Sequence, residues 1–133
     1  MMTKIEELTK KYDVDALGLG YTKFYHSLFN EVRHDVKKVL EIGVETGRSH
    51  RLWLEYFPNA TIYGFDIFEW GVDEFHKLQE GNPNLDRSVM FKGDQEVVSD
   101  LEKFLSLHGG DFDVIIDDGG HSMRQQQITM GVL

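Results

Sequence analysis

The sequence predicts an α/β domain in which a parallel β-sheet carries helices on both faces. Four short apolar runs of the kind that form buried strands alternate with segments whose apolar residues recur at helical spacing. A glycine ends the first run, and an acidic residue ends or closely follows each later one. Because crossovers between parallel strands are right-handed and must cover apolar strands, this alternation favours one sheet with helices on both sides.

Two helices are expected before the sheet. The first spans residues 3–11 and opens on a capping box formed by Thr3 and Glu6. The second spans residues 22–33. Its apolar residues at helical spacing are Phe24, Leu28 and Val32, with Tyr25 and Phe29 beside them.

The sheet and its helices follow from residue 38 onward. Strands are expected at residues 38–43, 61–66, 88–91 and 112–116. Helices are expected at residues 48–57, after Gly71 with Val72, Phe75 and Leu78 on one side, and after Asp94 with Val97, Leu101, Phe104 and Leu105. Asp94 is expected to cap this third helix and Gly109-Gly110 to end it, while Ser122 and Gln125 form a capping box that opens a last helix.

Composition limits the classes of function. The chain of 133 residues, 41% of them hydrophobic, suits one compact sheet domain over residues 36–133, preceded by an N-terminal helical segment over residues 1–35. The absence of cysteine excludes disulfides and thiolate zinc sites. We expect a cytoplasmic protein with no membrane partner, because no stretch resembles a secretory signal or a bilayer span.

The charge is unevenly distributed. Residues 1–60 hold nine basic and nine acidic side chains, whereas residues 61–133 hold five and fourteen, so the net charge of −9 comes from the second half. This balance argues against a nucleic acid partner, which requires clustered Lys and Arg. It suits a cationic ligand.

The loop over residues 41–47 has the form ExGxxxG between a strand and a helix. Gly43 permits a sharp bend, and Gly47 permits close packing where the helix begins. The dinucleotide pattern GxGxxG fails at Glu45, whose carboxylate would repel a pyrophosphate, and no GKS or GKT follows. The loop favours a ligand with a cationic head and no phosphate, such as S-adenosylmethionine (SAM), although a tight turn with surface glutamates has the same pattern.

Two further acidic residues lie where ligands of such sheets bind, at the carboxyl ends of the strands. Asp66 ends the second strand, where its carboxylate can accept hydrogen bonds from both hydroxyls of a ribose. Asp94 follows the third strand and can meet the exocyclic amine of an adenine. Each also has a purely structural interpretation, as a helix cap or a solvated turn residue.

These motifs resemble those of the class I, Rossmann-like SAM-dependent methyltransferases over residues 36–124. The resemblance rests on residues 39–43, Asp66, Gly93-Asp94 and residues 113–118. A narrower likeness, to macrocin/mycinamicin-type sugar O-methyltransferases, comes from residues 20–25 and 117–121. It implies methyl transfer to a hydroxyl of a sugar or another small molecule.

The resemblance also implies residue roles. The residues implied to bind SAM are Glu41, Gly43 and Gly47 around the methionine part, Asp66 at the ribose, Asp94 at the adenine and Asp117 near the amino-acid end. His121 is expected to act as the general base, because imidazole, with an ordinary pKa of about 6.5, can accept a hydroxyl proton. Asp118 is expected to bind Mg²⁺ or to orient another group. Packing of His121 before the last helix and solvation of Asp118 are the structural alternatives.

A complete sheet of this family has seven strands, and this chain accounts for about four. We therefore expect a C-terminally truncated product that carries the cofactor-binding half, rather than a natural minimal domain. Its fourth strand would have an open edge, which we expect the N-terminal segment or a second copy in a homo-oligomer to cover. An NAD-type Rossmann oxidoreductase domain and a non-catalytic SAM-binding module remain the alternative functions.

Overall fold

The computed structural model describes residues 2–12, 19–43, 47–67 and 80–117. Its helices are α1 (Lys4–Lys11), α2 (Leu19–Phe29), α3 (Arg48–Tyr56), the short 3₁₀ helix η1 (Leu85–Arg87) and α5 (Val98–His108). Its strands are β1 (Lys38–Ile42), β2 (Thr61–Asp66), β3 (Ser88–Lys92) and β4 (Val114–Asp117). The helices expected after Gly71 and at Ser122 lie outside the described residues.

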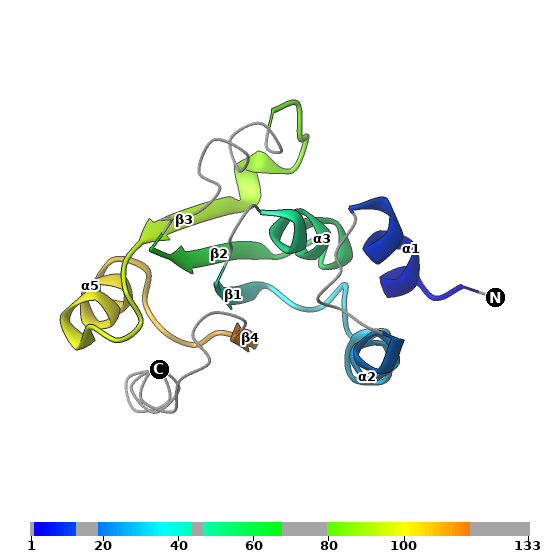
Figure 1. Ribbon diagram of the computed structural model, residues 1–133, viewed down its shortest axis with the longest axis horizontal. Coiled ribbons are helices and arrows are strands. Elements are labelled where there is room, and N and C mark those ends of the chain that lie inside the picture. The colour runs from blue at the N-terminus through cyan, green and yellow to red at the C-terminus, as the bar shows by residue number, and fades with distance from the viewer. Residues whose placement is uncertain (1, 13–18, 44–46, 68–79, 118–133) are drawn as a thin grey trace.

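The four strands form one parallel sheet in the order β3-β2-β1-β4 (Figure 1). The first three begin where the sequence predicts, and β4 begins two residues later, at Val114. The preceding residue, Asp113, joins the starts of β4 and β1, because its carboxylate accepts hydrogen bonds from the backbone N–H groups of Lys37 and Lys38 at 2.9 and 3.1 Å. In the described part of the chain, β4 pairs with β1 alone and forms an edge of the sheet.

Each face of the sheet carries its own apolar core, as predicted. Val39 of β1 faces α3 and the next residue, Leu40, faces α5, because successive side chains of a strand point to opposite faces. The core on the α3 side includes Val39, Ile62, Val114, Ile116, Leu52, Trp53 and Phe57. The core on the α5 side comprises Leu40, Ile42, Phe65, Leu101 and Phe104.

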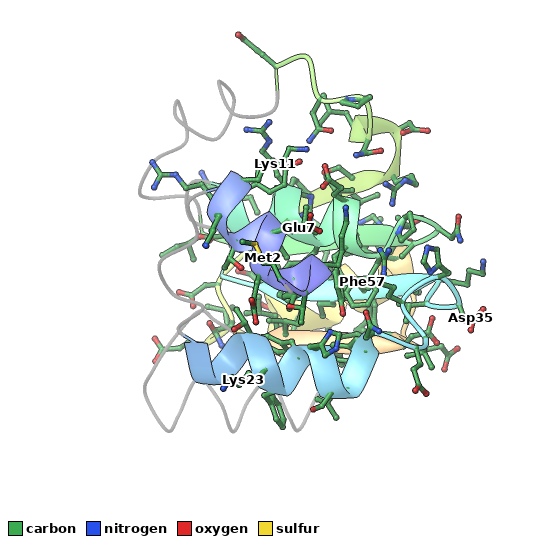
Figure 2. All side chains as sticks on the ribbon, turned by 90° about the vertical axis from the view of Figure 1, so that its right-hand side faces the viewer. Met2, Glu7, Lys11, Lys23, Asp35 and Phe57 are labelled. Carbon is green, nitrogen blue, oxygen red and sulfur yellow. The ribbon has the colours of Figure 1, made fainter. Side chains whose placement is uncertain are left out.

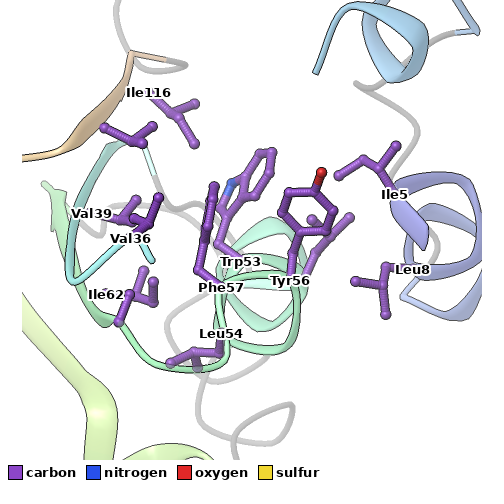
Figure 3. Packing of buried hydrophobic residues seen from close by; sticks show 13 residues of the cluster. Ile5, Leu8, Val36, Val39, Trp53, Leu54, Tyr56, Phe57, Ile62 and Ile116 are labelled. Atoms are coloured by element: carbon purple, nitrogen blue, oxygen red, sulfur yellow. The ribbon is translucent and has the colours of Figure 1, made fainter. Parts of the chain in front are cut away.

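Helix α3 lies between the sheet and α1 (Figure 3). Trp53 and Phe57 point toward the sheet, whereas Tyr56 points toward Ile5 and Leu8 of α1. All five side chains are fully buried. This double contact explains why a helix of nine residues carries apolar groups around most of its circumference.

Helix α1 has the predicted start. Thr3 is its N-cap, and the Thr3 hydroxyl accepts a hydrogen bond from the backbone N–H of Glu6 at 3.3 Å. At its other end α1 is attached to α3 through Glu55, which accepts hydrogen bonds from Lys11 at 2.7 Å and from the Tyr12 hydroxyl at 2.9 Å. Figure 2 shows α1 and α2 together on this side of the molecule, with Lys11 on α1 and Lys23 on α2.

Helix α2 differs from the prediction in its bounds and in the face that it buries. It spans Leu19–Phe29 rather than residues 22–33, and turns follow it as far as Asp35. The stripe of Phe24, Leu28 and Val32 is exposed, at 57%, 51% and 44%. Tyr25 and Phe29 pack instead, with their rings edge-on to Trp53 and Phe57 at 5.4 and 5.6 Å between centroids.

The prediction that Asp94 caps the third crossover helix is wrong. Helix α5 begins at Val98 after Val97, and no side chain accepts a hydrogen bond at this N-cap. The Asp94 carboxylate instead accepts a hydrogen bond from the backbone N–H of Glu96 at 2.9 Å, which closes a local turn before the helix. The predicted end is confirmed, because Gly109 is the C-cap with φ 74°.

Among the described helices, none is long and apolar enough to cross a membrane.

Candidate cofactor site

The carboxyl ends of β1, β2 and β3 meet at one edge of the sheet. Ile42 lies opposite Phe65, and Phe65 lies opposite Phe91, so the residues that follow these strands are neighbours. Backbone hydrogen bonds of 2.9 Å join them, from Gly43 N–H to the carbonyl of Phe65 and from Gly93 N–H to that of Asp66. Gly43 after β1, Asp66 at the end of β2 and Gly93 just after β3 therefore lie next to one another at this edge.

The two glycines of the first loop adopt backbone conformations that favour glycine. Gly43 and Gly47 both have φ of 89°, in the left-handed region that L side chains rarely occupy. Gly47 is the N-cap of α3, and its carbonyl accepts a hydrogen bond from Arg51 N–H at 3.0 Å. The backbone of Gly43 thus bends as the sequence predicted, and Gly47 lies where α3 begins. Residues 44–46 lie outside the described range.

Glu41, in β1 two residues before Gly43, is a fully buried carboxylate with a side chain 0% exposed. Its Oε2 atom accepts a hydrogen bond from the Ser49 hydroxyl at 2.5 Å, in the first turn of α3. Its Oε1 atom lies 3.6 Å from His50 Nδ1 and has no hydrogen bond with the described residues. Burying an ionised carboxylate is costly unless it is paired, so this unfilled acceptor needs an explanation.

Asp66 and Asp94 lie half-buried at the same edge. Asp66 is opposite Lys92 in the register of β2 and β3. Asp94 follows Gly93, and its backbone N–H donates a hydrogen bond to the carboxylate of Asp100 at 2.9 Å. Asp117 ends β4, where its backbone is opposite Ile42.

The structure thus brings four of the predicted cofactor residues to one edge, Glu41, Gly43, Asp66 and Asp94, and places the backbone of Asp117 beside Ile42. Gly47 is the N-cap of α3. His121 and Asp118 lie outside the described residues. No group of three metal-ligating side chains occurs in the ranges that the structure describes.

Comparisons with known proteins point to one class of enzyme. The chain is 32% identical over 136 residues to 8-demethyl-8-(2-methoxy-alpha-L-rhamnosyl)-tetracenomycin-C 3'-O-methyltransferase of Streptomyces olivaceus, covering 95% of the chain and 32% of that protein. It is 32% identical over 127 residues to mycinamicin VI 2''-O-methyltransferase of Micromonospora griseorubida, covering 88% of the chain and 29% of that protein. No family model matches.

Comparison with solved structures points to the same class of enzyme. The fold matches the MycE methyltransferase of the mycinamycin biosynthetic pathway, in complex with Mg, S-adenosylhomocysteine (SAH) and mycinamycin VI, with a TM-score of 0.66 and 30% identity. The match covers 97% of this chain and 31% of that one. The chain is a homologue of these O-methyltransferases.

Its Rossmann-like α/β fold is therefore that of a methyltransferase, as predicted. The chain spans about a third of the length of the relatives that it matches.

Sequence reasoning missed three polar residues near this candidate site. Ser49 and His50 contact Glu41, and Ser88 contacts His50 through its hydroxyl at 2.7 Å. One signal was present in the sequence, because His50 lies three and four residues before Trp53 and Leu54 and therefore shares their buried helix face. A histidine on such a face requires polar partners within the fold.

Proposed function

We propose that this chain binds SAM across the carboxyl ends of β1, β2 and β3, and that the protein uses it to methylate a hydroxyl of a sugar or another small molecule. The observation that carries the proposal is the buried Glu41 carboxylate, whose Oε1 atom has no hydrogen bond with the described residues. It lies two residues before Gly43, at an edge that also carries Asp66 and Asp94. The homology to O-methyltransferases supports the same ligand.

The residues at this edge fit the hydrogen-bonding groups of SAM. The ammonium group, the two ribose hydroxyls and the adenine amine of SAM are donors, and carboxylates such as Glu41, Asp66 and Asp94 accept hydrogen bonds. SAM carries no phosphate, whereas these carboxylates would repel the pyrophosphate of NAD. The donor and acceptor pattern thus favours SAM over the dinucleotide alternative.

The proposed roles follow the order of the strands. Glu41, Gly43 and Gly47 hold the methionine part, Asp66 the ribose, Asp94 the adenine, and Asp117 lies near the amino-acid end. When bound, SAM supplies an electrophilic methyl group. The protein then has to orient the acceptor hydroxyl and remove its proton.

We propose roles in proton removal and in metal binding for two residues that follow β4 in the sequence. His121 is the general base, suited by the proton affinity of neutral imidazole. Asp118 is a ligand of Mg²⁺, which prefers oxygen ligands. MycE provides support, since its structure holds both Mg and SAH.

We also propose that the outer edge of β4 mediates self-association. In the described residues its backbone groups on that side pair with no strand, and such an edge can accept a strand from a second copy. Sedimentation velocity over a range of protein concentrations measures this association, and a monomer at all concentrations would contradict it.

The cofactor proposal is tested by titrating SAH into the protein calorimetrically. Asp66→Ala should weaken binding by about 1–3 kcal/mol, the usual cost of losing hydrogen bonds to a charged group. Asp86→Ala is the matched control, because Asp86 is an exposed aspartate in η1, just before β3 and thus at the opposite end of the sheet. Unchanged affinity of Asp66→Ala would overturn the ribose assignment, and tighter binding of NAD than of SAH would overturn the choice of cofactor.

A further inference from the structure

A buried polar network includes one residue of the proposed cofactor site, Glu41. It consists of Ser49, Glu41, His50 and Ser88, and we call it the Glu41 network. Glu41 and His50 are both 0% exposed, so their polar atoms need partners within the fold or in a bound ligand. The network joins the carboxyl end of β1, the first turn of α3 and the first residue of β3.

The contacts indicate which group donates each hydrogen bond of this network. An ionised carboxylate only accepts hydrogen bonds, so the Ser49 hydroxyl donates to Glu41 Oε2. His50 Nε2 lies 2.7 Å from the Ser88 hydroxyl, and His50 Nδ1 lies 3.6 Å from Glu41 Oε1. When Ser88 donates to Nε2, the single ring proton of neutral His50 is on Nδ1 and faces the carboxylate.

The other protonation states of His50 suit the site less well. With the ring proton on Nε2, the lone pair of Nδ1 would face Glu41 Oε1 in a buried, low-dielectric setting, which is repulsive. With both nitrogens protonated, the imidazolium would neutralise Glu41 and compete with a cationic ligand for the same carboxylate. The neutral Nδ1–H form satisfies Ser88 and leaves Oε1 of Glu41 able to accept a hydrogen bond from a ligand.

The distance of 3.6 Å between His50 Nδ1 and Glu41 Oε1 also leaves Oε1 able to accept a hydrogen bond. It is too long for a full hydrogen bond, so the Nδ1–H group orients Oε1 by electrostatic attraction without saturating it. Oε1 therefore keeps acceptor capacity for one further donor. The ammonium group of SAM is a donor of the required charge.

We propose that His50 is a positioning residue of the cofactor site, held by Ser88 as the neutral Nδ1–H tautomer so that Oε1 of Glu41 is available to the ammonium group of SAM. This inference rests on the proposed function. It assigns a part in cofactor binding to Ser88, which lies at the opposite end of β3 from Gly93 and Asp94. Neither residue touches the reacting atoms, so the effect appears in affinity for the cofactor.

The test combines histidine NMR with SAH affinity. In the free protein, ¹⁵N shifts of His50 should show the Nδ1–H tautomer, and Ser88→Ala should convert it to a mixture. Ser88→Ala should also weaken SAH binding about three- to tenfold, the range expected for one lost hydrogen bond, and Ser88→Thr should restore it to within about twofold. His50→Gln retains an N–H donor and should bind SAH more tightly than His50→Leu.

Two controls separate positioning from general stability. Ser27→Ala removes a serine hydroxyl that donates to the carbonyl of Phe24 on the exposed part of α2, and it should leave SAH affinity unchanged. Val39→Ala truncates the core of β1 two residues before Glu41, and it should lower the melting temperature with little change in affinity.

The outcomes are distinct. A wild-type protein that does not bind SAH would overturn the proposed function and this inference together. Wild-type binding with unchanged affinity in Ser88→Ala and His50→Leu would overturn the inference alone. An imidazolium or an Nε2–H tautomer of His50 in the free protein would also overturn the inference alone. Equal losses of SAH affinity in Val39→Ala and Ser88→Ala would overturn it as well.

Discussion

The guanidinium group of Arg87 donates a hydrogen bond to the carbonyl oxygen of Leu54, 2.6 Å away, in the last turn of α3. It also donates to the carbonyls of Phe57 and Ala60, at 3.0 and 2.7 Å. The last carbonyls of a helix have no partners within the helix and attract positive charge. Arg87 thus closes the end of α3 from a segment that directly precedes β3.

Arg87→Met should lower the free energy of unfolding by about 2–3 kcal/mol, because three partly buried carbonyls lose charge-assisted hydrogen bonds while the apolar stem is kept. Urea unfolding followed by circular dichroism measures the change. Lys103→Met, an exposed basic residue on α5, is the matched control and should change stability by less than about 0.5 kcal/mol. Equal effects of the two substitutions would contradict the capping role.

Gly93→Ala should lower the free energy of unfolding by about 1–3 kcal/mol through overpacking. A Cβ atom at Gly93 would lie 2.8 Å from the ring of Phe65 and 2.9 Å from that of Phe91, which stack on each other in the core. Gly110→Ala is the control, because a Cβ there has no neighbour within 4 Å. Thermal unfolding of both variants measures the difference, and the prediction fails if Gly93→Ala melts with the wild type.

The strands and helix α3, which connects β1 to β2, were predictable because apolar periodicity alone defines them. The bounds of β2 match the prediction, and α3 ends one residue earlier than predicted. Parallel topology then places the strand ends side by side, which is why Asp66 and Gly93 were expected together.

Tertiary contacts decided the features that sequence reasoning missed. Helix α2 has two adjacent apolar stripes, and the rings of Trp53 and Phe57 select the one with Tyr25 and Phe29. The contact of His50 with Ser88 joins residues 38 positions apart, which no local spacing reveals.

The attachment of α1 to α3 should weaken in acid. Burial raises the pKa of Glu55, but hydrogen bonds from Lys11 and Tyr12 outweigh it, so the pKa lies below its ordinary value. A depressed carboxyl pKa stabilises the fold above the unfolded-state value, about 4.3, and that contribution is lost as the pH falls through the folded-state pKa.

The stability difference between the wild type and Glu55→Gln should therefore be constant near neutral pH and shrink below about pH 4. Urea titrations at several pH values measure it. Glu102→Gln, at an exposed position on α5, is the control and should show a smaller pH-dependent difference. A difference for Glu55→Gln that is independent of pH would contradict the assignment.

Methyl transfer should depend on His121 and on a divalent cation. Loss of a general base typically lowers turnover by about 10²–10⁴-fold, so His121→Ala should lower kcat by that amount at saturating SAM with little change in SAH affinity. Asp118→Asn should raise the Mg²⁺ concentration needed for activity, because it removes one charged oxygen ligand. Initial rates with a sugar-bearing acceptor, measured with and without EDTA, test both roles. Asp86→Asn is the control on an exposed aspartate of η1. Normal turnover in His121→Ala would contradict its role as the general base. Activity that is unchanged by EDTA would contradict the requirement for a metal.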